Sequence, residues 1–159
     1  MWIQFFQDAF FAAIAAIGFA AISRPPRRAY LWCAIIAAIG HSSRFLLMNM
    51  PDPVHIIPAT LVSSFLIGIL AVFISPHFKF PAETCLFPAL LPMIPGIYAY
   101  KAFGGFALCL LSNQQASFNH NFYLFAYNAL TCGGILLCMV IGASLPIFIF
   151  KKISFQATR

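Results

Sequence analysis

Apolar residues form five long runs along the chain, separated by short polar or proline-rich segments. A helix needs about 20 mostly apolar residues to cross a bilayer, because the hydrocarbon core is about 30 Å thick and the helix rises about 1.5 Å per residue. The pattern therefore predicts an all-α integral membrane protein with about five transmembrane helices in a single transmembrane domain, 1–159. The expected spans are residues 5–22, 29–50, 54–75, 84–111 and 124–150.

Two of these runs carry a pattern of their own. The first has small residues at four-residue spacing, Ala12, Ala16 and Ala20, which favours close contact with another helix. The second is interrupted by Gly40-His41-Ser42-Ser43-Arg44, and only four spans remain if it is not counted. Before the fifth run, the Asn- and Gln-rich segment 112–121 is predicted to be a polar loop.

The fourth apolar run contains helix-breaking residues near its middle. We interpret the break that they predict as the feature around which the rest of the chain is organised. Pro92 and Pro95 lack an N–H and disfavour helical backbone before them, while Gly96 tolerates left-handed or irregular backbone. Irregular backbone at membrane depth is tolerated only where it is buried in protein or lines a wet cavity. A half-helix starting near Gly96 would point its positive end toward such a cavity, as at transporter sites. A simple proline kink in a packing helix is the alternative.

Composition narrows the class of protein. The sequence is 62% hydrophobic and only 8% charged, against about 25% charged in ordinary soluble domains. We expect the lipid bilayer as a partner and no nucleic acid, since the basic residues lie beside apolar runs. The five cysteines have no metal-ligand spacing, so we expect no metal site and no cofactor. No catalytic constellation is present, and an enzyme is not expected.

The basic residues predict the orientation of the helices, because short cytoplasmic loops retain Lys and Arg. With five spans, the connections on one side hold seven basic residues and those on the other side hold none. The N-terminus is therefore expected outside and the C-terminus in the cytoplasm. The seven residues are Arg24, Arg27, Arg28, Lys79, Lys151, Lys152 and Arg159.

Candidate binding residues lie within the spans. Arg44 is expected roughly 20–23 Å from the cytoplasmic end of its helix and His41 roughly 16–18 Å, with Lys101 near the level of Arg44. A membrane-embedded cation needs a paired or wet interior, and no acid is expected at that depth. The counter-charge is then a carboxylate of the substrate or an acid of a partner chain. The predicted substrate-binding residues are Arg44, His41, Gly96, Tyr98 and Lys101.

Each of these residues also has a plainer interpretation. Arg44 would then extend toward the outer headgroups, and His41 would only make a hydrogen bond in a helical interface. In the functional interpretation, His41 could relay protons or bind substrate, because histidine ordinarily titrates near neutral pH. Tyr98 would be one of many aromatic residues lining a helix. The two interpretations make different predictions for substitutions at Arg44.

The motif residues resemble the threonine/serine exporter family. The similarity covers nearly the whole chain, and its most specific elements are Gly40-His41 with Arg44 and Pro92 with Pro95-Gly96. The chain resembles the small subunit of the split form, which corresponds to the C-terminal half of the fused exporters. The other matching segments are Gly18-Phe19-Ala20, Leu31-Trp32-Cys33-Ala34 and Ala99-Tyr100.

The resemblance implies a function and a partner. It implies a multi-pass protein of the bacterial inner membrane, a larger subunit of the same family, and export of small anionic or zwitterionic carboxylates. These would be threonine and serine, or dicarboxylates such as succinate. A non-transporting membrane scaffold or assembly subunit is the alternative, for which the packing faces suffice.

The charge distribution gives a topology prediction. Reporter fusions should place Asp52 and Gln115 outside and Pro26 and the C-terminus inside. The measurement is the activity of reporters that work on one side of the membrane only. Finding Pro26 and the C-terminus on opposite sides would remove the second span from the topology.

Overall fold

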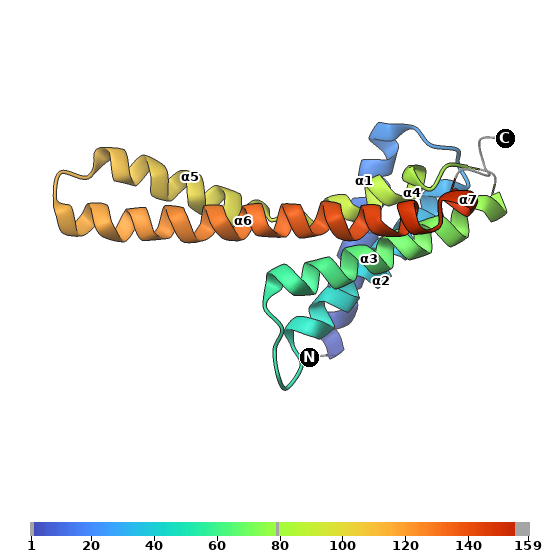
Figure 1. The fold of residues 1–159 in the computed structure, drawn as a ribbon, viewed down its shortest axis with the longest axis horizontal. Helices are drawn as coiled ribbons and strands as arrows, with labels where there is room; N and C mark the ends of the chain where they lie inside the picture. Colours follow the sequence, from blue (N-terminus) through green and yellow to red (C-terminus); the bar gives the residue numbers. More distant parts are fainter. Residues whose placement is uncertain (1, 79, 155–159) are drawn as a thin grey trace. The chain divides into compact units, whose positions relative to one another are not determined.

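The computed structural model describes residues 2–78 and 80–154, and the chain divides into two compact units (Figure 1). The first unit is the described part of Met1–Met93 with Cys138–Arg159, and the second is Ile94–Leu137. Of the basic residues used to predict orientation, Lys79, Arg159 and the side chain of Lys152 lie outside the described residues.

The first unit is a bundle of helices. Helix α2 packs against α1, α3 and α4, so it lies at the centre of the unit. The last part of α6 also belongs to this unit. The elements of the unit are α1 (Trp2–Ser23), α2 (Ala29–Met48), α3 (Ile56–Ile74), the 3₁₀ turn η1 (Ser75–Phe78), α4 (Glu83–Leu90), the 3₁₀ turn η2 (Leu91–Met93), the end of α6 (Gln115–Ile149) and α7 (Lys151–Ser154).

Small residues bring these helices together. Ala12, Ala16 and Ala20 are the buried residues of α1, which confirms the contact face predicted from their spacing. Between α2 and α4, the Cys33 thiol donates to the Thr84 carbonyl at 3.7 Å and the Cys85 thiol to the Ala29 carbonyl at 3.9 Å. Both cysteines are fully buried and act as small packing residues.

The helix ends follow local sequence rules. Helix α1 ends at Ser23, and Arg24 then takes a left-handed conformation with φ of 48° before Pro25. A left-handed residue followed by proline is a common way to end a helix. Helix α3 begins after His55, whose ring nitrogen accepts a hydrogen bond from the Ile57 N–H at 3.4 Å.

A second close approach joins α3 to the C-terminal part of α6. The Ser64 hydroxyl donates to the Cys138 carbonyl at 3.3 Å, and a Cβ at Gly142 would overlap the Ser64 hydroxyl and lie 2.6 Å from the Leu61 carbonyl oxygen. The absence of a side chain at Gly142 therefore lets the two backbones meet.

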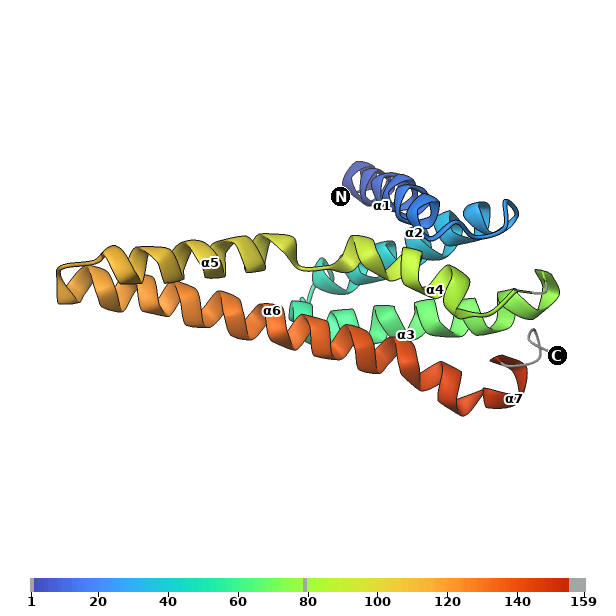
Figure 2. The same ribbon diagram turned by 90° about the horizontal axis from the view of Figure 1, so that it is seen from above.

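The second unit is a helical hairpin of α5 (Gly96–Leu111) and the first part of α6, which lie side by side (Figure 2). The loop predicted over 112–121 is wrong, because α6 already begins at Gln115 and only three residues connect the helices. The Asn121 amide donates to the Ser112 hydroxyl at 3.0 Å and so ties the first turns of α6 to the end of α5. The polar residues of this segment therefore lie mostly in the first turns of a helix and not in a loop.

The helices confirm the all-α membrane class. Among the described residues, four helices are long and apolar enough to cross a bilayer: α1, α2, α3 with η1, and α6. The polar second segment counts among them as α2. The pair of Glu83–Met93 and Gly96–Leu111 qualifies as a fifth span if its two parts are taken as one broken span. Many large apolar side chains are exposed, such as Phe103 and Leu111 at 76%, and this surface suits contact with lipid tails.

The contact at Gly142 generates a matched test. We expect Gly142→Ala to destabilise the protein by about 1–3 kcal/mol, because the new methyl group meets backbone atoms that cannot move away. Gly133→Ala, in the same helix, meets nothing within 4 Å and should be neutral or stabilising by up to about 1 kcal/mol through helix propensity. The measurement is thermal denaturation in detergent, and equal midpoints for the two variants would contradict this packing.

Candidate functional site

The predicted helix break is present and lies at Ile94 and Pro95. Helix α4 ends at Leu90, Pro92 lies in the 3₁₀ turn η2, and α5 begins at Gly96. Pro95 has φ of −79° and ψ of 59°, and the Gly96 N–H donates to the Ile94 carbonyl at 2.8 Å. These values define an inverse γ-turn centred on the proline.

Gly96 does not contribute to the break as predicted. No described glycine has a positive φ, and Gly96 is the first residue of an ordinary helix. A Cβ at this position would meet nothing within 4 Å. The prolines therefore cause the break, and the conformational freedom of the glycine is not used.

Arg44 binds the backbone that the break exposes. Met93 is the last residue of η2, so its carbonyl is among those that a helix end leaves without an intrahelical donor. The Arg44 guanidinium donates to this carbonyl through Nη1 at 3.1 Å. A cation at the C-terminal end of a helical segment also faces the negative end of its dipole. Arg44 therefore stabilises the end of the broken helix in two ways. It donates a hydrogen bond to an exposed carbonyl, and it places a positive charge at the negative end of the helix dipole.

The second arm of Arg44 reaches His41. Nη2 of Arg44 lies 2.9 Å from Nε2 of His41, and Nδ1 of His41 lies 2.6 Å from the Asp8 carboxylate. Arginine can only donate hydrogen bonds, so Nε2 accepts and the ring proton is on Nδ1. Nδ1 then donates to Asp8. The result is a continuous chain of hydrogen bonds from α1 through α2 to the broken segment.

This geometry corrects the expectation that no acid lies at the depth of Arg44 and His41. About four helical turns separate Asp8 from the end of α1, and about three separate His41 from the start of α2. Because α1 and α2 are joined by a short connection and pack together, these similar heights bring the two side chains into contact. Asp8 is the member of this candidate site that the sequence analysis missed.

The rest of the polar motif in α2 serves packing against α3. Gly40 is buried, and a Cβ there would overlap the side chain of Ile67. The Ser43 hydroxyl lies 2.7 Å from the Gly40 carbonyl and 2.9 Å from the Ser63 hydroxyl. The motif thus places one polar face of α2 toward α1 and the break, and another toward α3.

The remaining predicted binding residues, Gly96, Tyr98 and Lys101, belong to the second unit. Gly96 and Lys101 are exposed, and Tyr98 is half-buried. His41 and Arg44 lie together within the first unit. A substrate-binding role for all five residues stays a prediction.

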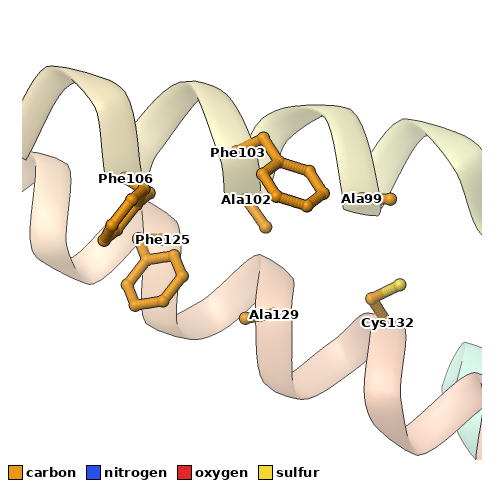
Figure 3. Close-up of a pocket in the computed structure, with 7 residues that line it drawn as sticks. All are labelled: Ala99, Ala102, Phe103, Phe106, Phe125, Ala129 and Cys132. Atoms are coloured by element: carbon orange, nitrogen blue, oxygen red, sulfur yellow. The ribbon is translucent and has the colours of Figure 1, made fainter.

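The hairpin of the second unit has a groove of about 390 Å³ between α5 and α6 (Figure 3). Its walls are apolar, and Phe103, Phe106 and Phe125 are the largest side chains. An apolar groove offers no hydrogen-bonding partner to a carboxylate. The other lining residues are Ala99, Ala102, Ala129 and Cys132.

Metal chemistry has no donor set in the described part of the chain. Over residues 2–78 and 80–154, no three His, Cys, Asp or Glu side chains gather in a way that could hold a metal ion. The candidate site is therefore the hydrogen-bonded chain Asp8, His41, Arg44 and the Met93 carbonyl, which we call the polar relay.

The fold and this site define a multi-pass helical membrane protein with ionisable side chains at a helix break, a combination that recurs in transporters. The chain belongs to the threonine/serine exporter family, ThrE, whose model matches residues 8–149. A relative from Haemophilus influenzae, described as an uncharacterized protein, is 33% identical over 158 residues. The match covers 94% of this chain and 49% of that relative, so the chain spans about half its length. No solved structure matches the chain.

Proposed function

We propose that this chain is one half of a two-component exporter of small carboxylate-bearing metabolites in the bacterial inner membrane. Its substrates are threonine and serine, or a succinate-like dicarboxylate. A larger membrane subunit of the same family supplies the other half of the pathway. The chain acts as a transporter subunit and not as an enzyme.

The family match is the observation that carries this proposal. Membership of the threonine/serine exporter family supports a transport role for small substrates of that type. The half-length match to the Haemophilus relative supports a transport unit to which this chain contributes only one part. Transporters built from two related halves commonly bind substrate near the bilayer midplane, at discontinuous helices.

Within this chain, the polar relay is the place best suited to a carboxylate. Arg44 is only partly buried and presents its planar guanidinium next to a broken helix. Such a fork matches the two oxygens of a carboxylate, which makes arginine the preferred side chain for this group. Asp8 balances charge in the resting state through His41, so an arriving carboxylate competes for Arg44 with existing hydrogen bonds.

A non-transporting scaffold or assembly subunit is the second candidate. The close contacts at Gly40 and Gly142 favour it, since such faces hold helices together in any membrane complex. In that case Arg44 serves the broken helix alone, and flux depends on it only through assembly.

Substitutions at Arg44 separate the two candidates. Arg44→Gln should weaken apparent affinity for threonine or succinate roughly ten- to a hundredfold, because a charge-assisted hydrogen bond contributes about 1.5–3 kcal/mol. Arg44→Lys should be impaired less, since an ammonium keeps the charge but loses the fork. The measurement is concentration-dependent uptake into inverted vesicles that hold the variant with its larger subunit.

Uptake is normalised to assembled complex, and Arg27→Gln, an exposed arginine outside the helices, is the matched control. Normal affinity in both Arg44 variants, with reduced assembly, would assign Arg44 to the scaffold role. Lys101→Gln and Tyr98→Phe in the same assay test the predicted contribution of the second unit.

The need for a partner gives a separate prediction. The purified chain in liposomes should transport neither threonine nor succinate, and flux should appear when the larger subunit is added. Liposomes with the larger subunit alone are the control. Robust flux from this chain alone would overturn the two-component arrangement.

A further inference from the structure

A cavity lies between the end of α1 and the start of α4, within the first unit. Its volume is about 390 Å³, which falls within the roughly 300–1,000 Å³ of small-ligand sites. Ser23 and Arg24 contribute polar side chains from one wall, and Glu83 and Thr84 contribute them from the other. This cavity is therefore polar where the groove between α5 and α6 is apolar.

Arg24 and Glu83 place opposite charges on the walls of the cavity. Both residues are exposed. Among the described residues, they form no ion pair with each other, and no hydrogen bond engages either side chain. A guanidinium and a carboxylate that share a cavity without pairing can each bind the opposite charge of one ligand. The complementary ligand therefore carries an anionic group and a cationic group.

The backbone on both walls is held in a defined conformation. Arg24 has φ of 48°, and it is followed by Pro25 and Pro26, whose rings restrict φ. On the other wall, Glu83 and Thr84 lie in the first turn of α4. Little backbone freedom is lost when a ligand binds to such walls, and this favours affinity.

The cavity lies at the boundary of the membrane. Ser23 is the last residue of the candidate span α1, and Glu83 is the first residue of the broken fifth span. The ends of spanning helices lie at the level of the lipid headgroups. Ile22, next to Ser23, is 78% exposed, and Phe87, which lines the cavity, is 63% exposed. These apolar side chains offer a surface to the acyl chains of a lipid whose headgroup enters the cavity.

We propose that this cavity binds the headgroup of an aminophospholipid, with the phosphate at Arg24 and the primary ammonium at Glu83. Phosphatidylethanolamine is the simplest lipid of this class. A free amino acid carries the same two charges, but the headgroup-level position and the apolar surface beside the cavity favour the lipid. The proposal does not depend on the export function proposed above.

The two charges select among headgroups. A primary ammonium donates hydrogen bonds to the Glu83 carboxylate, whereas the trimethylated nitrogen of phosphatidylcholine has no N–H to donate. Phosphatidylglycerol has the phosphate without a cation, so it leaves Glu83 unpaired. Arg27 and Arg28, which are exposed in the same connection, attract any anionic lipid. They do not line the cavity and therefore do not produce this selectivity.

Glu83 also has a plainer role in the fold. It is an acidic residue in the first turn of α4, and the preceding Ala82 provides no side-chain cap. A negative charge at this position stabilises the helix through its dipole. That role alone predicts that Glu83→Gln loses stability without any change in lipid preference.

The first test compares headgroups on the wild-type chain. Native mass spectrometry of the full chain in detergent measures the binding of phosphatidylethanolamine, its mono- and dimethylated forms, phosphatidylcholine and phosphatidylglycerol, all with the same acyl chains. We expect phosphatidylethanolamine to bind about ten- to a hundredfold more tightly than phosphatidylcholine or phosphatidylglycerol, because a charge-assisted hydrogen bond is lost with each of these. Equal affinities for phosphatidylethanolamine and phosphatidylcholine, or tighter binding of phosphatidylglycerol, would overturn the proposal.

The second test assigns the preference to the cavity. Arg24→Gln should weaken phosphatidylethanolamine and phosphatidylcholine alike, since both carry the phosphate. Glu83→Gln should reduce the affinity for phosphatidylethanolamine to that for phosphatidylcholine. The control is Arg27→Gln, which should keep the wild-type preference because this arginine does not line the cavity. Thermal denaturation without lipid reports the stability of each variant, and a preference that survives in folded Glu83→Gln would contradict the assignment.

Free threonine separates the two sources of the paired charges. Excess threonine in the same measurement should leave phosphatidylethanolamine bound to the wild-type chain. Displacement of the lipid by threonine would make the cavity a site for a soluble amino acid, and the lipid assignment would then be wrong.

Discussion

The fold depends on how the broken fourth helix satisfies its backbone. A carbonyl without a donor costs several kcal/mol in hydrocarbon, so a break at membrane depth needs a hydrogen-bond donor from elsewhere in the protein. Arg44 supplies it to Met93. The guanidinium then needs a place of its own, and His41 and Asp8 extend the network to α1. One proline turn thus accounts for three ionisable side chains on two other helices.

Local features of the sequence predicted the structure correctly, whereas a contact between two helices was not predicted. Apolar runs and prolines act locally, so the helices and the position of the break follow from periodicity and from Pro92 and Pro95 alone. The alanine face of α1 was predicted correctly for the same reason, since its spacing is a local feature of one helix. The partnership of Asp8 and His41 was not, because it depends on the relative height and rotation of α1 and α2. Comparing the distance of each residue from the connecting loop was the signal that would have found it.

Other errors have equally physical causes. The segment after Ser112 was predicted as a loop from its polarity, but Asn and Gln side chains do not prevent a helix when they face outward or bond locally. Gly96 was credited with the break because glycine permits irregular backbone, yet the turn at Pro95 needs no positive φ. Gly40 and Gly142 are the glycines that matter sterically, and a pattern of small residues does not say which member faces a neighbour.

Charge balance in the polar relay explains why three ionisable side chains lie together in a membrane protein. The Asp8 carboxylate and the Arg44 guanidinium carry opposite charges, and the His41 ring joins them through its two nitrogens. An uncompensated charge is costly in a low-dielectric interior. Removing either Asp8 or Arg44 would leave the charge of the other uncompensated within the relay, so the acid of α1 and the arginine that binds the broken helix depend on each other.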